Sequence, residues 1–306
     1  MLETHLHVGV GHPVSLSILA LAGLFVGYIA GMFGIGGGFL LTPLLMFGFG
    51  IPAPVAVGSA LSQKCGSSVA SFLKYRSLKR GEPRIDLIML GGSLIGVDAG
   101  TRLLAHLSAL SAWHWNGRDV PAVNLALDLL FIVLLTAVAL YVFHDVWTAR
   151  GREAREDQTI PGPLARIRIP PYVDLPGVHL QQVSVPVLAY IGFLLGVASG
   201  VMGIGGGVIF MPILLYGYGL SARNAAGTGI LLLAVTVSFG TFEQALRGYV
   251  SLKLSLAILA GSSIGSQLGA LTTHVLPNRT LRLLFGVLVA ATVVMIAIDF
   301  LQLLSG

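Results

Sequence analysis

The chain has 306 residues, of which 55% are hydrophobic and only 10% are charged, and its mean hydropathy is +0.87. A soluble domain carries about 25% charged residues, so this composition excludes a soluble globular protein and requires lipid as the solvent for much of the surface. The net charge of +5 is not accompanied by aromatic and basic clusters, so nucleic acid is not a predicted partner.

Residues 1–14 form an N-terminal tail that contains no Lys or Arg up to Pro13. No small-residue cleavage site precedes the first apolar run, so no cleaved signal peptide is predicted. The tail contains His5, His7 and His12, but histidines on a flexible tail do not hold a defined metal geometry, and no metal site is predicted.

Eight apolar runs are long enough, at about 20 residues, to cross the hydrocarbon core of a bilayer. They cover residues 15–33 (continuing to 50 after a break), 53–75, 85–107, 122–147, 184–202 (continuing to 218), 222–246, 252–275 and 279–304. Open sheets cannot satisfy their edges in lipid, and a β-barrel would show alternating rather than continuous runs. We therefore predict an all-α, polytopic membrane protein with about eight transmembrane helices.

The one long polar stretch runs from residue 148 to 183, between the fourth and fifth apolar runs. It contains arginines, acids and prolines: Arg150, Arg152, Arg155, Arg166, Arg168, Glu153, Glu156, Asp157, Pro161, Pro163, Pro170 and Pro171. This composition predicts a solvated, partly disordered linker between two helical units, residues 15–147 and 184–306.

The distribution of basic residues predicts the orientation, because Lys and Arg are enriched in cytoplasmic loops. With the 76–84 loop inside, the cytoplasmic set is Lys74, Arg76, Lys79, Arg80, Arg84, the five linker arginines, Arg247 and Lys253, and the outer set is Arg102, Arg118, Arg223, Arg279 and Arg282. Eight crossings then place both termini and the linker in the cytoplasm of a multi-pass inner-membrane protein.

The sequence repeats itself at an offset of 169 residues. The run Gly34–Gly38, with the sequence Gly-Ile-Gly-Gly-Gly, recurs as Gly203–Gly207. Further pairs hold the same offset: Pro43 and Pro212, Gly48 and Gly217, Gly50 and Gly219, Gly58-Ser59 and Gly227-Thr228, and Gly92, Gly96 and Gly100 with Gly261, Gly265 and Gly269. Duplicated halves with matching helix breaks are typical of secondary transporters, whose sites lie at the repeat interface. Four crossings in each half predict parallel repeats, whereas an added re-entrant crossing would make them inverted.

Each glycine run predicts a helix break inside the membrane, because glycine costs about 1 kcal/mol relative to Ala in a helix. Unwound backbone at that depth is tolerated where it lines a cavity or is buried in protein. The helix that restarts after each break presents free N–H groups that attract anions. The predicted anion-binding positions are Gly36, Gly37, Gly38 and Phe39 in the first half, and Gly205, Gly206, Gly207 and Val208 in the second. The alternative for these runs is tight helix packing, which we favour for Gly92/Gly96/Gly100 and Gly261/Gly265/Gly269.

Lys64 lies near the middle of the 53–75 run, where a Lys costs roughly 2.5–3.5 kcal/mol to insert. Ser67, Ser68 and Ser71 share its helix face, and Gln63 is adjacent. An ammonium on a hydroxyl-lined face near two helix N-termini predicts an anion site. The second copy has Leu232 and Leu233 in place of Gln63 and Lys64, so the site is asymmetric, whereas Ser59 and Thr228 are equivalent and both offer hydroxyls.

Other polar residues give alternatives. Lys64 would have a structural role if it paired with Asp98 or Asp128, and Asp98 has Arg102 four residues further on. Asp98 is also the candidate for ion coupling. Cys65 is interpreted as a small apolar filler. No Ser/His/Asp, paired-carboxylate or HExxH arrangement is present, so no catalytic residue, enzyme activity or cofactor is predicted.

The paired Gly-Ile-Gly-Gly-Gly runs, each followed by an apolar stretch and a proline, resemble the TauE/SafE sulfite exporter family over nearly the whole chain, and Ser62-Gln63-Lys64 agrees with this. The long linker departs from the family pattern. The resemblance implies transport of sulfite, thiosulfate or small organosulfonates, mostly as export across a bacterial inner membrane.

Three hypotheses remain open at this point. The first is a secondary transporter of a small sulfur-containing anion, with H⁺ or Na⁺ as coupled ion. The second is an anion channel or uniporter of the same build. The third is a membrane scaffold or sensor, which would have no reason to retain Lys64. A homo-oligomer is compatible with each of them.

Overall fold

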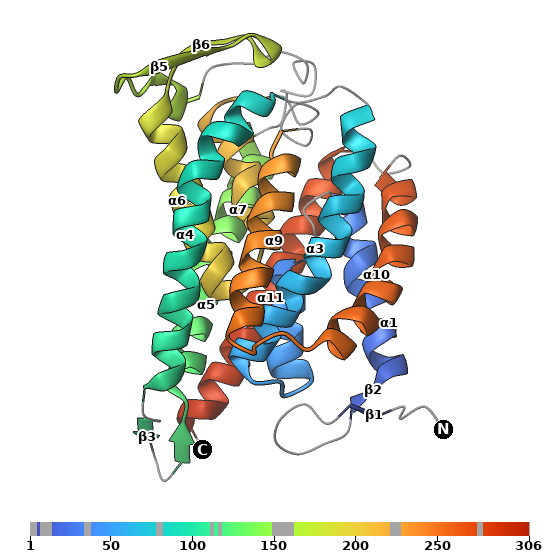
Figure 1. The fold of residues 1–306 in the computed structure, drawn as a ribbon. Helices are drawn as coiled ribbons and strands as arrows, with labels where there is room; N and C mark the ends of the chain where they lie inside the picture. The colour runs from blue at the N-terminus through green and yellow to red at the C-terminus, as the bar shows by residue number, and fades with distance from the viewer. Residues whose placement is uncertain are drawn as a thin grey trace.

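In a computed structural model of the chain, the described residues are 5–6, 14–33, 38–77, 82–110, 113–115, 118–148, 162–220, 228–273 and 278–305. Within these ranges the protein is a bundle of helices with short two-stranded hairpins at its two ends (Figure 1). The predicted all-α, polytopic fold is confirmed.

Eight helices of 17 or more residues make up most of the described structure. They are α1 (Leu16–Phe33), α3 (Ala53–Ser77), α4 (Pro83–Ala109), α5 (Ala122–Thr148), α6 (Val185–Met202), α9 (Ile230–Leu246), α10 (Leu252–Thr273) and α11 (Asn278–Ser305). Two shorter segments follow the glycine runs: α2 (Gly38–Pro43) with the π-helical turn η1 (Leu44–Gly48), and α7 (Gly207–Pro212) with the π-helical turn η5 (Ile213–Gly217). Both α2 and α7 end at a proline, which lacks the N–H that continues an α-helix.

Four of the described helices are long and apolar enough by themselves to cross a membrane: Pro83–Ala109, Ala122–His144, Val185–Met202 and Leu283–Leu301. The flanks of the bundle are also apolar. Leu21, Ile95, Leu140 and Leu256 are all largely exposed, although a soluble protein would bury most such side chains. These outward-facing residues are therefore the lipid-contacting surface.

The strands cap the ends of the bundle. They pair antiparallel as β1 (His5–Leu6) with β2 (Val14–Ser15), β3 (Trp113–Trp115) with β4 (Arg118–Val120), and β5 (Tyr172–Leu175) with β6 (Leu180–Ser184). Residues 162–184 of the predicted linker are thus folded: they include the 3-10 turns η3 (Leu164–Arg166) and η4 (Pro176–Val178), and Leu175 and Val178 are buried. The remaining part, 149–161, lies outside the described residues.

The two halves of the chain pack on each other through glycine faces. A Cβ added at Gly23, Gly27 or Gly31 of α1 would overlap the backbone of α10, and one added at Gly192, Gly196 or Gly200 of α6 would meet the backbone of α4. The reciprocal faces, Gly92, Gly96 and Gly100 of α4 and Gly261, Gly265 and Gly269 of α10, meet the backbones of α6 and α1. The packing interpretation of these last six glycines is confirmed. All contacts of one interface recur in the other at an offset of 169 residues.

These contacts fix the directions of the helices. Because contact positions rise together along both partners, α1 runs parallel to α10, and α6 runs parallel to α4. By contrast α3 and α9 run antiparallel, through the pairs Gly58 and Gln244, Leu61 and Gly240, and Cys65 and Ser238. Helices α1 and α3 therefore point the same way, and α2–η1 must return through the bundle between them. The same holds for α7–η5 between α6 and α9.

Each half thus traverses the bundle five times rather than four. Figure 1 shows α1 beginning and α11 ending at the lower end of the molecule, whereas β5 and β6 lie at the upper end. The prediction that the termini and the linker share one side of the membrane is therefore wrong. Its physical cause is that the short returning segments were not counted as crossings.

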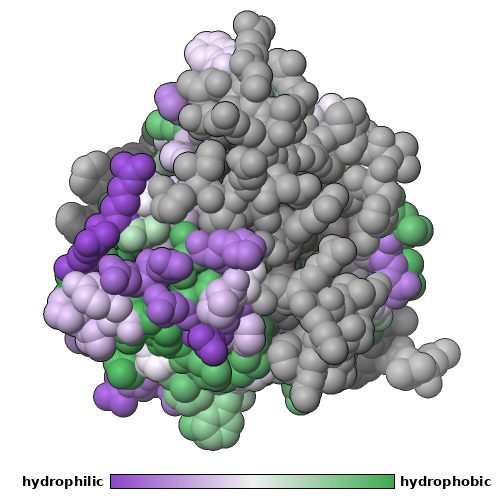
Figure 2. All heavy atoms as spheres, turned by 90° about the horizontal axis from the view of Figure 1, so that it is seen from above, coloured by the Kyte–Doolittle hydropathy of each residue, from purple (hydrophilic) through white to green (hydrophobic). Residues whose placement is uncertain are grey.

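The upper end, which we call the linker end, is polar where it is described. Figure 2 looks onto this end and shows hydrophilic side chains gathered beside apolar ones. Exposed residues of this region include Arg166, Arg168, Asp174, His179 and Gln181. This composition is that of a water-facing surface above the apolar flanks.

Candidate functional site

The second glycine run forms a helix break inside the bundle. Helix α6 ends at Gly203, whose N–H donates to the Ser199 carbonyl at 2.9 Å, and α7 begins at Gly207. Gly203, Gly205 and Gly206 have φ of +70°, +66° and +77°, a region that residues with a Cβ rarely adopt. The glycines are therefore required by the backbone path of this turn, as the predicted break demands.

Lys64 of α3 points into this break. Its side chain is only 4% exposed, and its ammonium donates hydrogen bonds to the carbonyl oxygens of Gly203 (3.3 Å) and Ile204. A Cβ added at Gly205 would lie 2.9 Å from the Lys64 Nζ. The ammonium thus sits against carbonyls at the negative end of α6, where a cation is stabilised.

The N-terminus of α7 lies on the other side of the same turn. Ile209 and Phe210 donate their N–H groups to the Gly206 carbonyl, whereas a helix offers no intrahelical acceptor to the N–H groups that precede them. The predicted positions Gly206, Gly207 and Val208 are all buried here. The break therefore brings one ammonium and one helix N-terminus, both positive, into the same buried region.

Unpartnered polar side chains surround the break. The hydroxyls of Thr42 and Ser199 and the amide oxygen of Gln244 are fully buried and have no hydrogen-bond partner. Thr42 Oγ1 lies 3.0 Å from a Cβ built on Gly203, and the Gln244 amide donates to the Gly200 carbonyl at 3.2 Å. Buried polar atoms usually have a partner, so these three groups are available to a polar ligand.

Gln63 lies next to Lys64 but is already engaged. Its amide donates to the Ser262 hydroxyl of α10 at 2.6 Å. This bond links α3 to the helix that packs on α1, and it leaves the amide oxygen of Gln63 as the group that remains for a ligand.

Ser59 and Thr228 are not part of the break. The Ser59 hydroxyl accepts from the Ser251 N–H at 3.1 Å, and the Thr228 hydroxyl accepts from the Glu82 N–H at 3.0 Å. Both hydroxyls therefore satisfy backbone groups where α10 and α4 begin, at opposite ends of the bundle. The structure does not bring either of them to Lys64.

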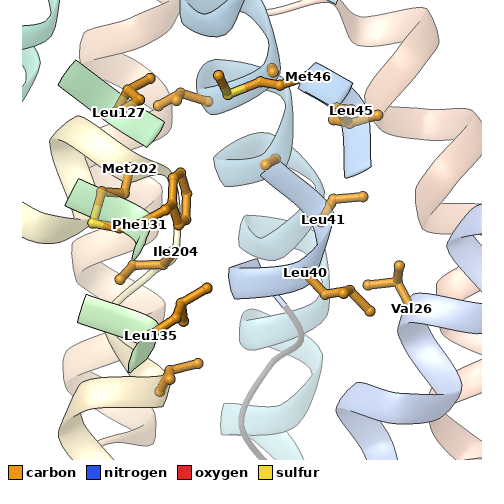
Figure 3. Packing of buried hydrophobic residues seen from close by; sticks show 14 of the residues in the cluster. Val26, Leu40, Leu41, Leu45, Met46, Leu127, Phe131, Leu135, Met202 and Ile204 are labelled. Carbon is orange, nitrogen blue, oxygen red and sulfur yellow. The ribbon is translucent and has the colours of Figure 1, made fainter. Parts of the chain in front are cut away.

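The first break is only partly described. Gly36 and Gly37 lie outside the described residues, and the backbone of Gly38 and Phe39 forms the first turn of α2. Figure 3 shows Leu40 and Leu41 of α2 on one side of the central core, with Ile204 and Met202 of the second break on the other. The two halves thus reach one shared core, while convergence of their helix ends on one anion stays a prediction.

The acidic candidates lie away from Lys64. Asp98 pairs with Arg102 at 2.9 Å, and their side chains are 34% and 72% exposed, so this is a local ion pair on the outer surface of α4. Asp128 of α5 is fully buried, and neither of its carboxylate oxygens has a hydrogen-bond partner. The structural pairing of Lys64 with Asp98 or Asp128 is therefore not present.

Sequence reasoning missed Thr42, Ser199 and Gln244. A signal for two of them was the repeat itself: Thr42 and Ser199 align with the apolar residues Met211 and Ala30. Polar residues that break the repeat symmetry, as Lys64 does against Leu233, mark the half-specific part of the site. Gln244 aligns with Tyr75 and gave no comparable signal.

Apolar flanks, crossed halves and a buried lysine at a mid-bundle helix break define a multi-pass membrane transporter. The profile of the family described as Sulfite exporter TauE/SafE matches residues 19–296. The chain therefore belongs to the TauE/SafE family, and the resemblance noted in the sequence is confirmed. Because this is a family of transporters, the prediction that the chain is not an enzyme is confirmed as well.

Curated relatives agree with this class. The chain is 25% identical over 275 residues to "Probable membrane transporter protein YunE" of Bacillus subtilis, covering 88% of this chain and 92% of that protein. It is 25% identical over 283 residues to "Probable membrane transporter protein MJ0441" of Methanocaldococcus jannaschii, covering 88% and 90%. A shorter match, 32% over 121 residues, covers 37% of this chain and 18% of "Probable membrane transporter protein MamO" of Magnetospirillum gryphiswaldense. No solved structure matches the chain.

Proposed function

We propose that this protein is a secondary transporter that exports sulfite or another small organosulfur or sulfonate anion across the bacterial inner membrane. The anion would be held at the second helix break, with Lys64 as its counter-charge. The observation that carries this proposal is the Lys64 ammonium, which is buried in mid-helix and directed at the Gly203–Gly207 turn.

The chemistry of the break suits an anion rather than a cation. Lys64, the N-terminus of α7 and the hydroxyls of Thr42 and Ser199 all offer positive charge or donors. In the described structure no acidic side chain is paired with Lys64, and its partners are neutral carbonyls. A cation transporter would need carboxylates at this position.

Lys64 would act by exchanging partners. With the anion absent, the carbonyls of Gly203 and Ile204 stabilise the ammonium. An entering oxyanion would compete for the same protons through stronger, charge-assisted hydrogen bonds. Release of the carbonyls would loosen the end of α6, so that anion binding and helix movement are linked through one side chain.

The linker end is proposed to face the cytoplasm. Its described residues include Arg84, Arg166 and Arg168, and the segments that join helix ends there add Lys74, Arg76, Lys79, Arg80, Arg150, Arg152, Arg155, Arg223, Arg279 and Arg282. The opposite end carries Arg102, Arg118, Arg247 and Lys253. This imbalance favours the linker end inside and both termini outside the cytoplasm.

The test is uptake of labelled sulfite into proteoliposomes by the wild type, Lys64→Met and Lys253→Met. The control residue Lys253 is an exposed lysine at the start of α10. The proposal expects saturable flux in the wild type and in Lys253→Met, and flux at the level of protein-free liposomes in Lys64→Met, with all three proteins monodisperse. Unchanged flux in Lys64→Met would remove Lys64 from the site.

The same vesicles separate the other hypotheses. Flux of thiosulfate or taurine-like sulfonates without sulfite flux would keep the transporter class and change the cargo. Flux that neither saturates nor shows counterflow of labelled against unlabelled anion would indicate a channel. No flux of any of these anions would favour a scaffold or sensor.

A further inference from the structure

Asp128 is a buried acid that the anion site does not use. It lies on α5 six residues after Ala122, about 9 Å along the helix from its start. The side chain is 0% exposed, and both carboxylate oxygens are without a hydrogen-bond partner. Buried carboxylates are normally paired with a cation or bound by several donors, so this group needs an explanation.

No cation compensates Asp128 in the described structure. The charged group whose field acts on it is Asp299 of α11, which has the same sign and lies six residues before the end of its helix. On the other helices packed against α5, Lys64 of α3 binds carbonyls, and Asp98 and Arg102 of α4 bind each other. His106 of α4 is exposed, and α6 contains no charged residue.

An ionised carboxylate in such a place is costly. Burial of an unpaired charge costs several kcal/mol even after relaxation, and a like charge nearby adds to that cost. A neutral carboxylic acid avoids both penalties. The arrangement therefore requires Asp128 to hold a proton in this conformation.

The neighbours of Asp128 connect it to the break. Phe131, in the next turn of α5, lies beside Met202 and Ile204 in the central core (Figure 3). Ile204 supplies a carbonyl that holds Lys64. One layer of packed side chains thus separates the buried acid from the lysine and the helix break.

We propose that Asp128 is a proton-binding site and that anion transport is coupled to proton movement through it. This inference rests on the proposed function and names H⁺ as the coupled ion. Opening the bundle end that carries Ala122 and Ser305 would admit water to Asp128 and allow the proton to leave. Closure then requires a proton, so the proton selects between the two conformations.

The protonated acid is observable without any transport. Infrared difference spectra of the purified protein at neutral pH are expected to contain a carboxylic-acid C=O band that disappears in Asp128→Asn. Asp98→Asn is the matched control, because Asp98 is ion-paired at the surface, and it is expected to retain the band. A band that is unchanged in Asp128→Asn would overturn the proposal whatever the cargo proves to be.

Coupling is measured in proteoliposomes with thiosulfate or methanesulfonate, which unlike sulfite do not titrate near neutrality. The wild type and Asp98→Asn are expected to accumulate the anion when a pH gradient is imposed, and to move protons that a trapped pH dye reports. Asp128→Asn, which mimics the protonated state, is expected to lose both responses and keep exchange of labelled against unlabelled anion. Gradient-driven accumulation that persists in Asp128→Asn would contradict the coupling, whereas absence of exchange in the wild type would contradict the proposed function instead.

Discussion

Ser59 and Thr228, which occupy equivalent positions in the two halves, make the same hydrogen bond at opposite ends of the bundle. Each hydroxyl accepts a backbone N–H, from Ser251 at 3.1 Å and from Glu82 at 3.0 Å. Both side chains are buried. Each bond joins the start of one half's fourth long segment to the other half, so the hydroxyls hold the two halves together.

Replacing Thr228 by Val should therefore destabilise the protein. The change leaves the buried Glu82 N–H without its acceptor, at a cost of about 1–3 kcal/mol. Thermal unfolding in detergent, followed by tryptophan fluorescence, should show a lower midpoint for Thr228→Val than for the control Thr228→Ser. A Thr228→Val protein of unchanged stability that fails to transport would instead make the hydroxyl a substrate ligand.

Gly205→Ala should impair transport more than its backbone cost explains. Ala at φ +66° costs about 1–2 kcal/mol, and its Cβ would also press on Lys64, 2.9 Å away. Gly248→Ala is the matched control, since Gly248 has φ +74° and nothing within 4 Å of a built Cβ. Similar loss of stability in both, with flux lost only in Gly205→Ala, is the expected result; equal flux would mean that the Lys64 position does not matter.

Gly96→Ala should weaken the interface between α4 and α6. A Cβ there overlaps the Phe193 carbonyl, so the helices must move apart, at a cost of about 1–3 kcal/mol. Gly91→Ala on the same helix has nothing within 4 Å and should be neutral or slightly stabilising. The comparison is made by unfolding midpoints of the two purified variants, and equal midpoints would argue against tight packing at Gly96.

The proposed orientation is tested with fusions at the C-terminus, which follows α11 at the end opposite the linker. Alkaline phosphatase fused there should be active, because it folds only outside the cytoplasm, whereas a fluorescent protein fused there should be dark. Fusions within residues 149–161 should give the reverse pattern. A fluorescent C-terminal fusion would reverse the orientation of the whole bundle.

Much of the helical architecture could be predicted because lipid imposes a simple rule: a span needs about 20 apolar residues. The eight long helices lie at the expected runs. The returning segments α2–η1 and α7–η5 escaped this rule, since each has only 11 residues. They line the core rather than face lipid, so no full span length is required of them.

The site was visible in part for similar reasons. Lys64 stood out because a charge in mid-span is costly, and the glycine runs because they break helices. The partners of Lys64 could not be foreseen, because the carbonyls of Gly203 and Ile204 carry no side-chain signature. The isolation of Asp128 was also hidden, since it depends on what the neighbouring helices fail to place beside it.

The crossed packing of the halves has a consequence for biosynthesis. Gly23 of α1 meets Ile258 of α10, a partner that the ribosome delivers roughly 230 residues later. Until then the glycine face of α1 has only lipid or the insertion machinery against it. Helix α6, by contrast, meets α4 as soon as it is inserted. The two interfaces, alike in the finished protein, are therefore assembled at different times, and a truncated first half would lack the surface that completes α1.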